Sequence, residues 1–176
     1  MDTLQAILTR RSYRGKYLNT PVPREHLQAI MEAGCAAPSG CNKQTASFIA
    51  VDDPVLLDRL KALVTPPVAG TAPAWILVLT RPIVAYRDRR FNVQDYAAAI
   101  QNMLLAAHAL GYASCWYEGH ITDEDDIAGQ IAKALDLPEE YRIVCVLPVG
   151  VPEGEAKPPK KLPNAQRMWF NKGPKA

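Results

Sequence analysis

Residues 96–110 contain no charged side chain, and this stretch constrains the fold more than any other feature of the sequence. Asn92 before it is typical of a helix start, and Gly111 after it favours the left-handed conformation of a helix end. A helix on a protein surface normally has one polar face, but here apolar or small residues surround the predicted helix axis. We therefore expect a long helix that is buried on every side.

Complete burial of this helix has two explanations in a chain of 176 residues. In the first, a second subunit covers the side that the chain itself leaves open, which predicts a homodimer. In the second, the chain wraps the helix entirely by itself. We prefer the homodimer and keep the second explanation open.

Apolar spacing and turn residues predict further elements on both sides of this helix. A short helix capped by Asp2 leads into a basic segment, and a second helix begins near Pro23 and stops before Pro38. Residues 65–73 are expected to form a loop, and the charged residues 81–91 are expected to be exposed. The remaining predicted helices span residues 54–63 and 123–135, and the predicted strands span residues 47–51, 74–80, 113–117 and 141–149.

The composition is that of an ordinary globular domain, and it argues against several kinds of partner. With 20 basic and 18 acidic residues, the net charge of +2 does not indicate a surface for nucleic acid or for a membrane. Residues 96–115 are uncharged but include Gln101, Asn102 and His108, so a buried helix fits them better than a membrane span. Met1 leads into an amphipathic stretch without a secretion signal, and we expect a cytoplasmic protein.

The cysteines and histidines do not form the pattern of a metal site or of a hydrolytic triad. The cysteines lack the two-residue spacing of zinc ligands, so we expect no bound metal. Cys35, Cys115 and Cys145 are expected to be buried reduced thiols, whereas Cys41 lies in a loop that could place it near a ligand. The sequence also lacks the glycine-rich motifs of Rossmann and P-loop nucleotide sites.

Residues 10–14 are the first of three segments that contain the residue types of a binding site. The guanidinium groups of Arg10, Arg11 and Arg14, together with the hydroxyl of Ser12, suit forked hydrogen bonds to a phosphate. Alternatively, these cations only complement the negative end of the preceding helix dipole. Both interpretations stay open for this segment alone, because basic clusters are usually solvated.

The second segment is a loop rich in small and amide residues. Small residues let the backbone approach a ligand closely, and the amides supply donors and acceptors. A planar heterocycle with alternating carbonyl and ring-nitrogen groups suits such a loop, although the same composition is typical of a plain turn. The candidate binding residues of this loop are Pro38, Ser39, Gly40, Asn42 and Gln44.

The third segment consists of Trp116, Tyr117, Glu118 and Gly119 at the end of a predicted strand. Function often collects at such positions in sheets that helices cover. The glycine lets the main chain present its N–H groups to a ligand. An aromatic core edge followed by a turn is the alternative.

Composition divides the chain into a domain of residues 1–150 and a tail of residues 151–176. The tail is rich in proline and lysine and shows little periodicity. It also carries Met168, Trp169 and Phe170, whose apolar side chains are costly to leave in water. We expect an extended tail that packs on its own domain or on a partner subunit.

Taken together and in this order, the three segments resemble the motifs of the nitroreductase family, and the resemblance covers nearly the whole chain. Residues 10–14 resemble the family's Arg-x-Ser-x-Arg/Lys segment, and residues 37–44 resemble its Ala-Pro-Ser-x-x-Asn-x-Gln loop. Residues 101–111 are similar to its central dimer helix. The other matching parts are residues 116–119, the Gly-hydrophobic-Pro turn within residues 147–152, and the basic pair Lys160-Lys161.

The resemblance implies an α+β protein with a three-layer α/β/α fold, in which helices flank a mixed, mainly antiparallel sheet. It implies a homodimer with flavin mononucleotide (FMN) at the subunit interface. The activity implied is transfer of reducing equivalents from NADH or NADPH through the flavin to a small oxidised acceptor, such as a nitroaromatic or a quinone, by a ping-pong mechanism. No catalytic side chain is needed, because the flavin carries the chemistry.

The resemblance also assigns roles to the segments. The arginines and Ser12 would hold the phosphate and the ribityl chain together with Lys160 or Lys161. The loop of residues 37–44 would address the flavin ring or its tail from one subunit. The backbone near Glu118 and Gly119 would face the ring nitrogen that carries the hydride.

Two departures from the family pattern leave parts of this interpretation open. Gln44 is followed by Thr45 and Ala46 instead of Pro-Trp, which predicts a more open wall, and the tail has Lys160-Lys161 instead of Lys-x-Arg. The alternatives are another flavin reaction on the same fold, namely dehalogenation, flavin breakdown or dehydrogenation, a flavin-binding sensor of low turnover, and an interaction domain without flavin.

Overall fold

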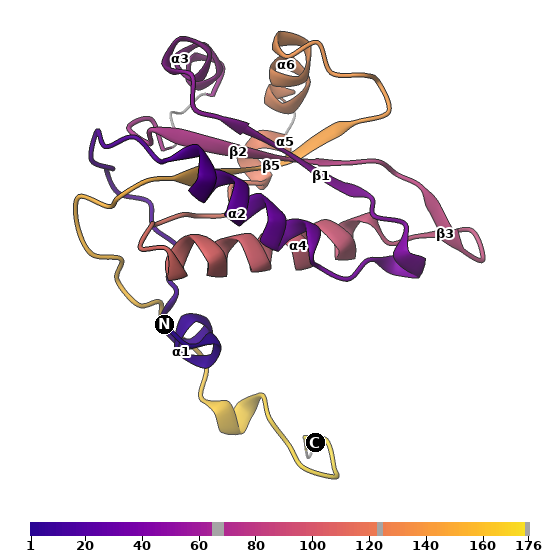
Figure 1. Cartoon of the computed structure of the whole chain (residues 1–176). Helices are drawn as coiled ribbons and strands as arrows, with labels where there is room; N and C mark the ends of the chain where they lie inside the picture. The colour runs from indigo at the N-terminus through magenta and orange to yellow at the C-terminus, as the bar shows by residue number, and fades with distance from the viewer. Residues whose placement is uncertain (65–68, 123–124, 175–176) are drawn as a thin grey trace.

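The structure, a computed structural model, describes residues 1–64, 69–122 and 125–174. The described residues form three layers, with a sheet between two layers of helices (Figure 1). The helices are α1 (Thr3–Thr9), α2 (Arg24–Cys35), α3 (Pro54–Ala62), α4 (Asn92–Ala109), α5 (Gly119–Thr122) and α6 (Ile127–Ala134), with short 3-10 turns η1 (Gly40–Asn42) and η2 (Asn164–Gln166). The strands are β1 (Ala46–Val51), β2 (Ala74–Thr80), β3 (Val84–Tyr86), β4 (Arg89–Arg90) and β5 (Arg142–Val149).

The sheet has the order β1-β2-β5, and both of its strand pairs are antiparallel. The N-terminal segment adds one parallel bridge, between Ser12 and Ser114. The expected α+β fold with a mainly antiparallel sheet between helices is therefore confirmed.

The central strand β2 shows why the domain has three layers, because every residue of this strand is buried. Successive side chains of a strand point to opposite faces of the sheet, so two apolar surfaces must be covered. On one face, Trp75, Leu77 and Leu79 join a core cluster with Leu57 and Leu60 of α3 and Ile127 and Ile131 of α6. On the other face, Ile76 and Val78 join a cluster with Leu27 and Ile30 of α2 and Ile100 and Met103 of α4.

Helices α2 and α4 pack closely because a glycine lies at their contact. A Cβ atom on Gly34 would lie 2.9 Å from the side chains of both Met103 and Phe48. A larger residue at this position would push α2 away from α4 and β1, so the small residue sets the distance between these elements.

The single chain does not bury α4 on every side. The face toward the sheet and α2 is buried, but Val93 is 55% exposed and Leu110 39% exposed, and Gln101 is exposed as well. The explanation in which the chain wraps this helix by itself is therefore wrong for the described residues. Burial by a second subunit stays a prediction.

Two expected elements differ from the structure. Residues 113–117 form no continuous strand: Ala113 and Tyr117 make single bridges to Gly150 and Val146 of the β5 region, while Ser114 between them pairs with Ser12 on the other side. The segment thus alternates between two neighbours instead of following one. Residues 81–91, expected only to be charged and exposed, contain the hairpin of β3 and β4.

The hairpin turns at Arg87 and Asp88, which both have positive φ angles of 46° and 61°. Two successive left-handed residues fit the mirror-image turns that hairpins prefer, and aspartate tolerates this conformation. Parts of two other predictions lie outside the described residues, namely positions 65–68 of the expected loop and the first residues, 123–124, of the expected helix 123–135. The described helix α6 begins at Ile127.

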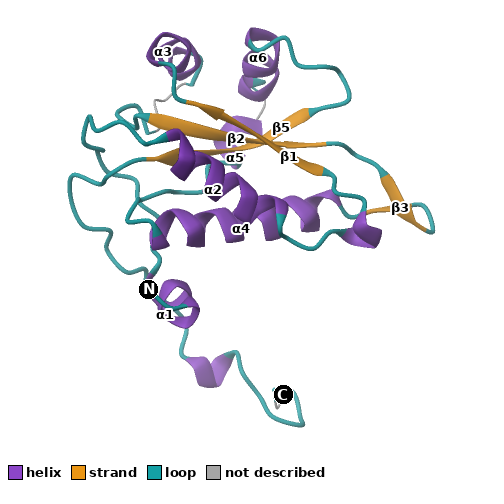
Figure 2. Cartoon of the chain, in the orientation of Figure 1, coloured by secondary structure: helices purple, strands orange, loops and turns teal. Residues whose placement is uncertain are grey.

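The tail runs away from the domain past α1 and is drawn as loop apart from the single turn η2 (Figure 2). Every described residue after Ala156 is exposed, including Trp169 at 48% and Phe170 at 88%. The extended form is as expected, but the described tail does not bury these rings on its own domain. Packing on a partner remains a prediction.

Among the described residues, no helix combines the length and apolar character that crossing a bilayer requires. In the same residues, no group of three or more histidine, cysteine or acidic side chains is arranged to hold a metal ion. Cys115 and Cys145 are buried, but Cys35 is exposed, which corrects the expectation for this thiol. Cys35 ends α2 and lies off the inward face that Leu27 and Ile30 define.

Candidate functional site

The first segment and the tail form a basic cavity of about 230 Å³, which we call the cradle. None of the described residues that line it carries a carboxylate. The residues around the cradle are Arg10, Arg11, Ser12, Arg14, Lys157, Pro159 and Lys161. Lys160 is not among them, so the structure brings only Lys161 of the expected pair to the arginines. It also places Lys157 there, which was not predicted from the sequence because the tail shows little periodicity.

Backbone pairing brings the tail to the arginines. Leu18 donates a backbone hydrogen bond to Val151 over 2.9 Å, and Glu153 donates one to Lys16 over 2.9 Å. The hydroxyl of Tyr13 donates to the carbonyl of Lys16 and accepts a 3.2 Å hydrogen bond from the N–H of Gly154. These contacts fix the start of the tail beside the first segment, and the lysines follow within a few residues.

The arginines of the cradle differ in whether their donors have hydrogen-bond partners. Arg11 donates from Nη1 to the carbonyl oxygens of Leu8 at 2.7 Å and Arg10 at 2.9 Å, so it caps the carboxyl end of α1 as the dipole alternative suggested. Arg10 has buried Nε and Nη1 atoms without a hydrogen-bond partner among the described residues. Arg10 as a whole is half-buried, but nitrogen donors that are buried without an acceptor are costly. Arg10 together with Arg14 and the lysines is therefore a donor set that fits an anion.

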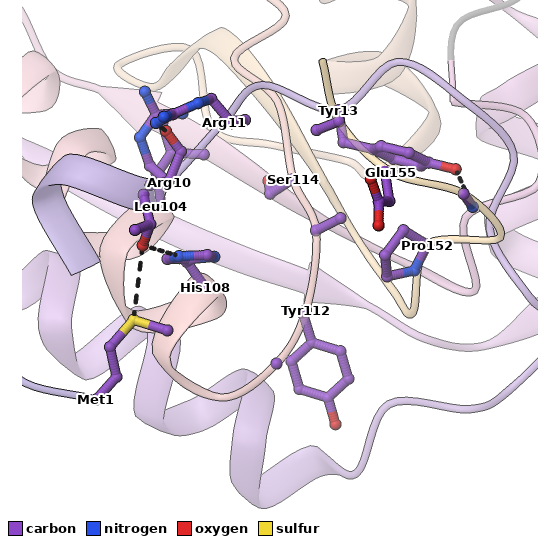
Figure 3. A pocket seen from close by; sticks show the side chains of 15 residues that line it. Met1, Arg10, Arg11, Tyr13, Leu104, His108, Tyr112, Ser114, Pro152 and Glu155 are labelled. Carbon is purple, nitrogen blue, oxygen red and sulfur yellow. Dashed lines mark hydrogen bonds between the residues drawn. The ribbon is translucent and has the colours of Figure 1, made fainter. Parts of the chain in front are cut away.

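A second cavity of about 460 Å³ lies between α1, the carboxyl end of α4 and the start of the tail (Figure 3). It shares Arg10 and Arg11 with the cradle but is also lined by Glu155, which makes it less suited to a phosphate. On its wall, His108 Nε2 lies 2.8 Å from the hydroxyl of Thr9 and links α4 to α1. Burial and the nearby charges of Arg10 and Arg11 lower the pKa of His108.

The second segment is an exposed loop with an unusual backbone. Cys41, Asn42 and Gln44 all have left-handed conformations, with φ angles of 50°, 54° and 48°. The side chains of Asn42 and Gln44 are exposed and available to a ligand, as is Cys41. At Gly40 a Cβ atom would lie 2.6 Å from the ring of Phe91, so only glycine allows this close approach.

Asp95 in the first turn of α4 holds this loop, and it lies outside the three segments predicted from the sequence. Its buried carboxylate accepts a 2.7 Å hydrogen bond from the N–H of Gly40 and another of 2.7 Å from the hydroxyl of Thr45. The backbone N–H of Gln44 also donates to the hydroxyl of Ser39 at 3.0 Å. An acidic residue one position before the uncharged stretch was the available signal, but its partners lie about 50 residues away in sequence.

The third segment is organised around the carboxylate of Glu118. Its Oε1 accepts a 2.9 Å hydrogen bond from the hydroxyl of Tyr96, and its Oε2 accepts a 2.7 Å hydrogen bond from the indole of Trp116. Burial, together with the hydrogen bond to Glu118, raises the pKa of Tyr96 to about 12. Tyr96 therefore stays a proton donor across the physiological pH range.

The peptide at the end of this segment presents N–H groups. The carbonyl of Glu118 accepts from the amides of Ile121 at 2.8 Å and Thr122 at 3.0 Å, which starts α5. The N–H groups of Glu118 and Gly119 donate to no atom of the described residues, and Gly119 is exposed. Two unpaired donors, one of them on the exposed Gly119, suit a ligand with an acceptor atom.

The three segments are distributed along α4. The loop is held at Asp95 near the amino end of α4, while Thr9, directly before the first segment, contacts His108 in the last turn. At about 1.5 Å per residue, these 13 positions correspond to about 20 Å. Residues 112–118, which lead into the third segment, run back between the two ends, because Tyr112 pairs with Ala107 and Glu118 with Tyr96. The cradle and the loop of one chain therefore cannot both contact the same end of a ligand.

The layered α+β domain and the cradle built from both ends of the chain define the class of protein, and the comparisons with known proteins agree with it. The model of the nitroreductase family matches residues 7–66 and 61–151. A curated relative from Methanothermobacter thermautotrophicus, named "Putative NADH dehydrogenase/NAD(P)H nitroreductase", is 36% identical over 154 residues, which are 86% of this chain and 78% of that protein. The chain belongs to the nitroreductase family.

Solved structures show the same fold. A nitroreductase with bound FMN from Bacteroides fragilis is 28% identical, with a TM-score of 0.77, over 98% of this chain and 100% of that one. An FMN-dependent nitroreductase from Clostridium difficile is 26% identical, with a TM-score of 0.79, over 97% of this chain and 99% of that one. The fold implied by the motifs is thus confirmed.

Proposed function

We propose that this chain is an FMN-dependent oxidoreductase that passes reducing equivalents from NADH or NADPH to a small oxidised acceptor such as a nitroaromatic or a quinone. The observation that carries the proposal is the cradle, where the described lining consists of arginines, lysines, Ser12 and Pro159, and where Arg10 has unpaired buried donors. The similar nitroreductase from Bacteroides fragilis has bound FMN, whose phosphate fits this donor set. When bound, the flavin supplies the electron and hydride chemistry.

The residues of the chain bind and orient the cofactor. Arg10, Arg14, Lys157 and Lys161 provide cations for the phosphate, and Ser12 provides a hydroxyl. The unpaired N–H groups of Glu118 and Gly119 would donate to a ring nitrogen of the flavin. These residues follow Ser114, which pairs with Ser12 of the first segment. No side chain is assigned as acid or base.

We further propose that the protein works as a homodimer with FMN at the subunit interface. In this dimer, the tail of residues 151–176 of one subunit packs on the domain of residues 1–150 of the other. Three features support this arrangement: the open face of α4, the exposed rings of the tail, and the separation between the cradle and the loop. Pro38, Ser39, Asn42 and Gln44 of the partner would then complete a site whose cradle lies in this chain. Four free cysteines support a reducing compartment such as the cytoplasm.

One absorbance spectrum of the purified protein tests the cofactor, because bound flavin is yellow. Anaerobic addition of NADH and then of NADPH to the same sample should bleach the spectrum and identify the donor. Steady-state kinetics with a quinone should give parallel double-reciprocal lines, since donor and acceptor would use the same open side of the site in turn. A colourless protein without affinity for FMN would contradict the proposal, and intersecting lines would contradict the ping-pong order.

The phosphate assignment has a matched test. Arg10→Ala and Arg14→Ala should purify with little flavin, because each removes charged hydrogen bonds to the phosphate. Arg59→Ala on α3 is the control, since this arginine is exposed and lies outside the cradle. Cradle variants that purify as yellow as the control would show that the phosphate binds elsewhere.

A further inference from the structure

Two neighbouring residues of α4, Asp95 and Tyr96, contact two of the segments described above. Asp95 binds the loop at Gly40 and Thr45, and Tyr96 binds Glu118. Both residues are buried, with 4% and 5% exposure. Successive residues of a helix point in directions about 100° apart, so one turn can reach two different segments.

The contact of Tyr96 fixes the peptide that presents the unpaired N–H groups. Both carboxylate oxygens of Glu118 are used, one by the hydroxyl of Tyr96 and the other by the indole of Trp116. The donors come from different elements, so the Glu118 side chain is held from two directions. Because its carbonyl is also bonded to α5, the Glu118 residue has little freedom to turn. Because Glu118 cannot turn, the N–H groups of Glu118 and Gly119 keep one direction.

The contact of Asp95 fixes a loop whose backbone conformation is unfavourable. Left-handed conformations at non-glycine residues persist only where the surrounding structure determines them, and this loop has three of them. Asp95 binds at Gly40, before these residues, and at Thr45, directly after them. The carboxylate also lies in the first turn of α4, where the helix dipole favours a negative charge.

We propose that Asp95 and Tyr96 are positioning residues of the flavin site: Asp95 sets the shape of the loop that addresses the ring, and Tyr96, through Glu118, sets the direction of the N–H groups that face the ring nitrogen. This inference rests on the proposed function. Both side chains are buried against the segments that they bind, so each acts on FMN binding through the segment that it holds.

The test uses Asp95→Asn and Tyr96→Phe, which keep the size of each side chain. The asparagine amide offers one acceptor in place of two, and phenylalanine offers no hydroxyl to Glu118. Asp58→Asn and Tyr86→Phe are the matched controls, since Asp58 is exposed on α3 and Tyr86 is 50% exposed on β3.

Amide hydrogen exchange of the full-length protein without flavin reports each segment separately. Tyr96→Phe should speed exchange in peptides covering residues 116–122 and leave residues 39–45 unchanged, and Asp95→Asn should do the reverse. Each variant should also weaken FMN binding by about three- to tenfold in a fluorescence titration, since the loss of one hydrogen bond acts through the segment and not on the flavin itself. The controls should bind FMN as the wild type does.

A purely structural role would lower the melting temperature and speed exchange uniformly without the local pattern, and that result would overturn the inference. Wild-type affinity for FMN in both variants would overturn it alone and leave the proposed function standing. A wild-type protein that takes up no FMN would overturn the proposed function and this inference with it.

Discussion

The neighbouring lysines of the tail provide the sharpest test of the cradle. Lys161 lines the cavity and Lys160 does not, although the two residues have the same charge and are both exposed. Lys161→Ala should weaken FMN binding, whereas Lys160→Ala should leave it within about twofold of the wild type. General attraction between the basic tail and an anion would instead make the two variants alike, because long-range electrostatics does not distinguish adjacent residues.

The expected size of the effect follows from the contact. A hydrogen bond to a charged group contributes about 1.5–3 kcal/mol to binding, and an exposed lysine falls at the lower end of this range. Because about 1.4 kcal/mol changes a dissociation constant tenfold, Lys161→Ala should raise the dissociation constant for FMN by about tenfold.

Fluorescence titration of FMN into flavin-free protein measures the effect, and riboflavin provides the internal control. Riboflavin lacks the phosphate, so both variants should bind it as the wild type does. Equal losses of FMN affinity in the two variants, or a loss of riboflavin affinity in Lys161→Ala, would refute the position of Lys161 at the phosphate.

Three further predictions concern pH, assembly and the core. The lowered pKa of His108 means that the unfolded chain takes up a proton first, so stability should be complete above a pH of about 6.5 and fall as the pH decreases below it; His108→Gln should remove this part of the dependence of melting temperature on pH. Deletion of residues 162–176 should leave a monomer at concentrations where the full chain sediments as a dimer, and an unchanged sedimentation coefficient would argue against the tail as a partner contact. Leu60→Ala, at a fully buried position of α3, should lower the free energy of unfolding in urea by about 2–5 kcal/mol, while Val55→Ala, at a position 71% exposed, should change it little.

Apolar periodicity and end signals predicted the helices and strands that are determined by residues close together in the sequence. Helix α4 follows from the uncharged residues 96–110 together with the end signals Asn92 and Gly111, and strand β2 follows from the apolar run 74–80; both elements are present. Residues 113–117 have the same apolar character but form only isolated bridges. Their pairing depends on Ser12 and on the β5 region, which are far away in sequence, and local patterns carry no information on such partners.

The candidate site shows the same limit. Arg10, Arg14 and the loop of residues 37–44 could be predicted from residue types alone, because guanidinium and amide groups have a recognisable chemistry. Asp95 and Tyr96 were not marked, since their importance comes from contacts with Thr45 and Glu118 and not from their own neighbours. Lys157 was equally hidden, because only the pairing of the tail with the first segment brings it to the cradle.

The exposed tail has a consequence for how the protein is handled. If its rings are buried only on a second copy, each free protomer carries Trp169 and Phe170 in water and lacks the loop that completes its site. Stability, cofactor retention and protomer concentration are then linked by mass action. Dilution should remove the partner and the FMN together, and the free protomer, with its rings in water, should be the form most prone to aggregate.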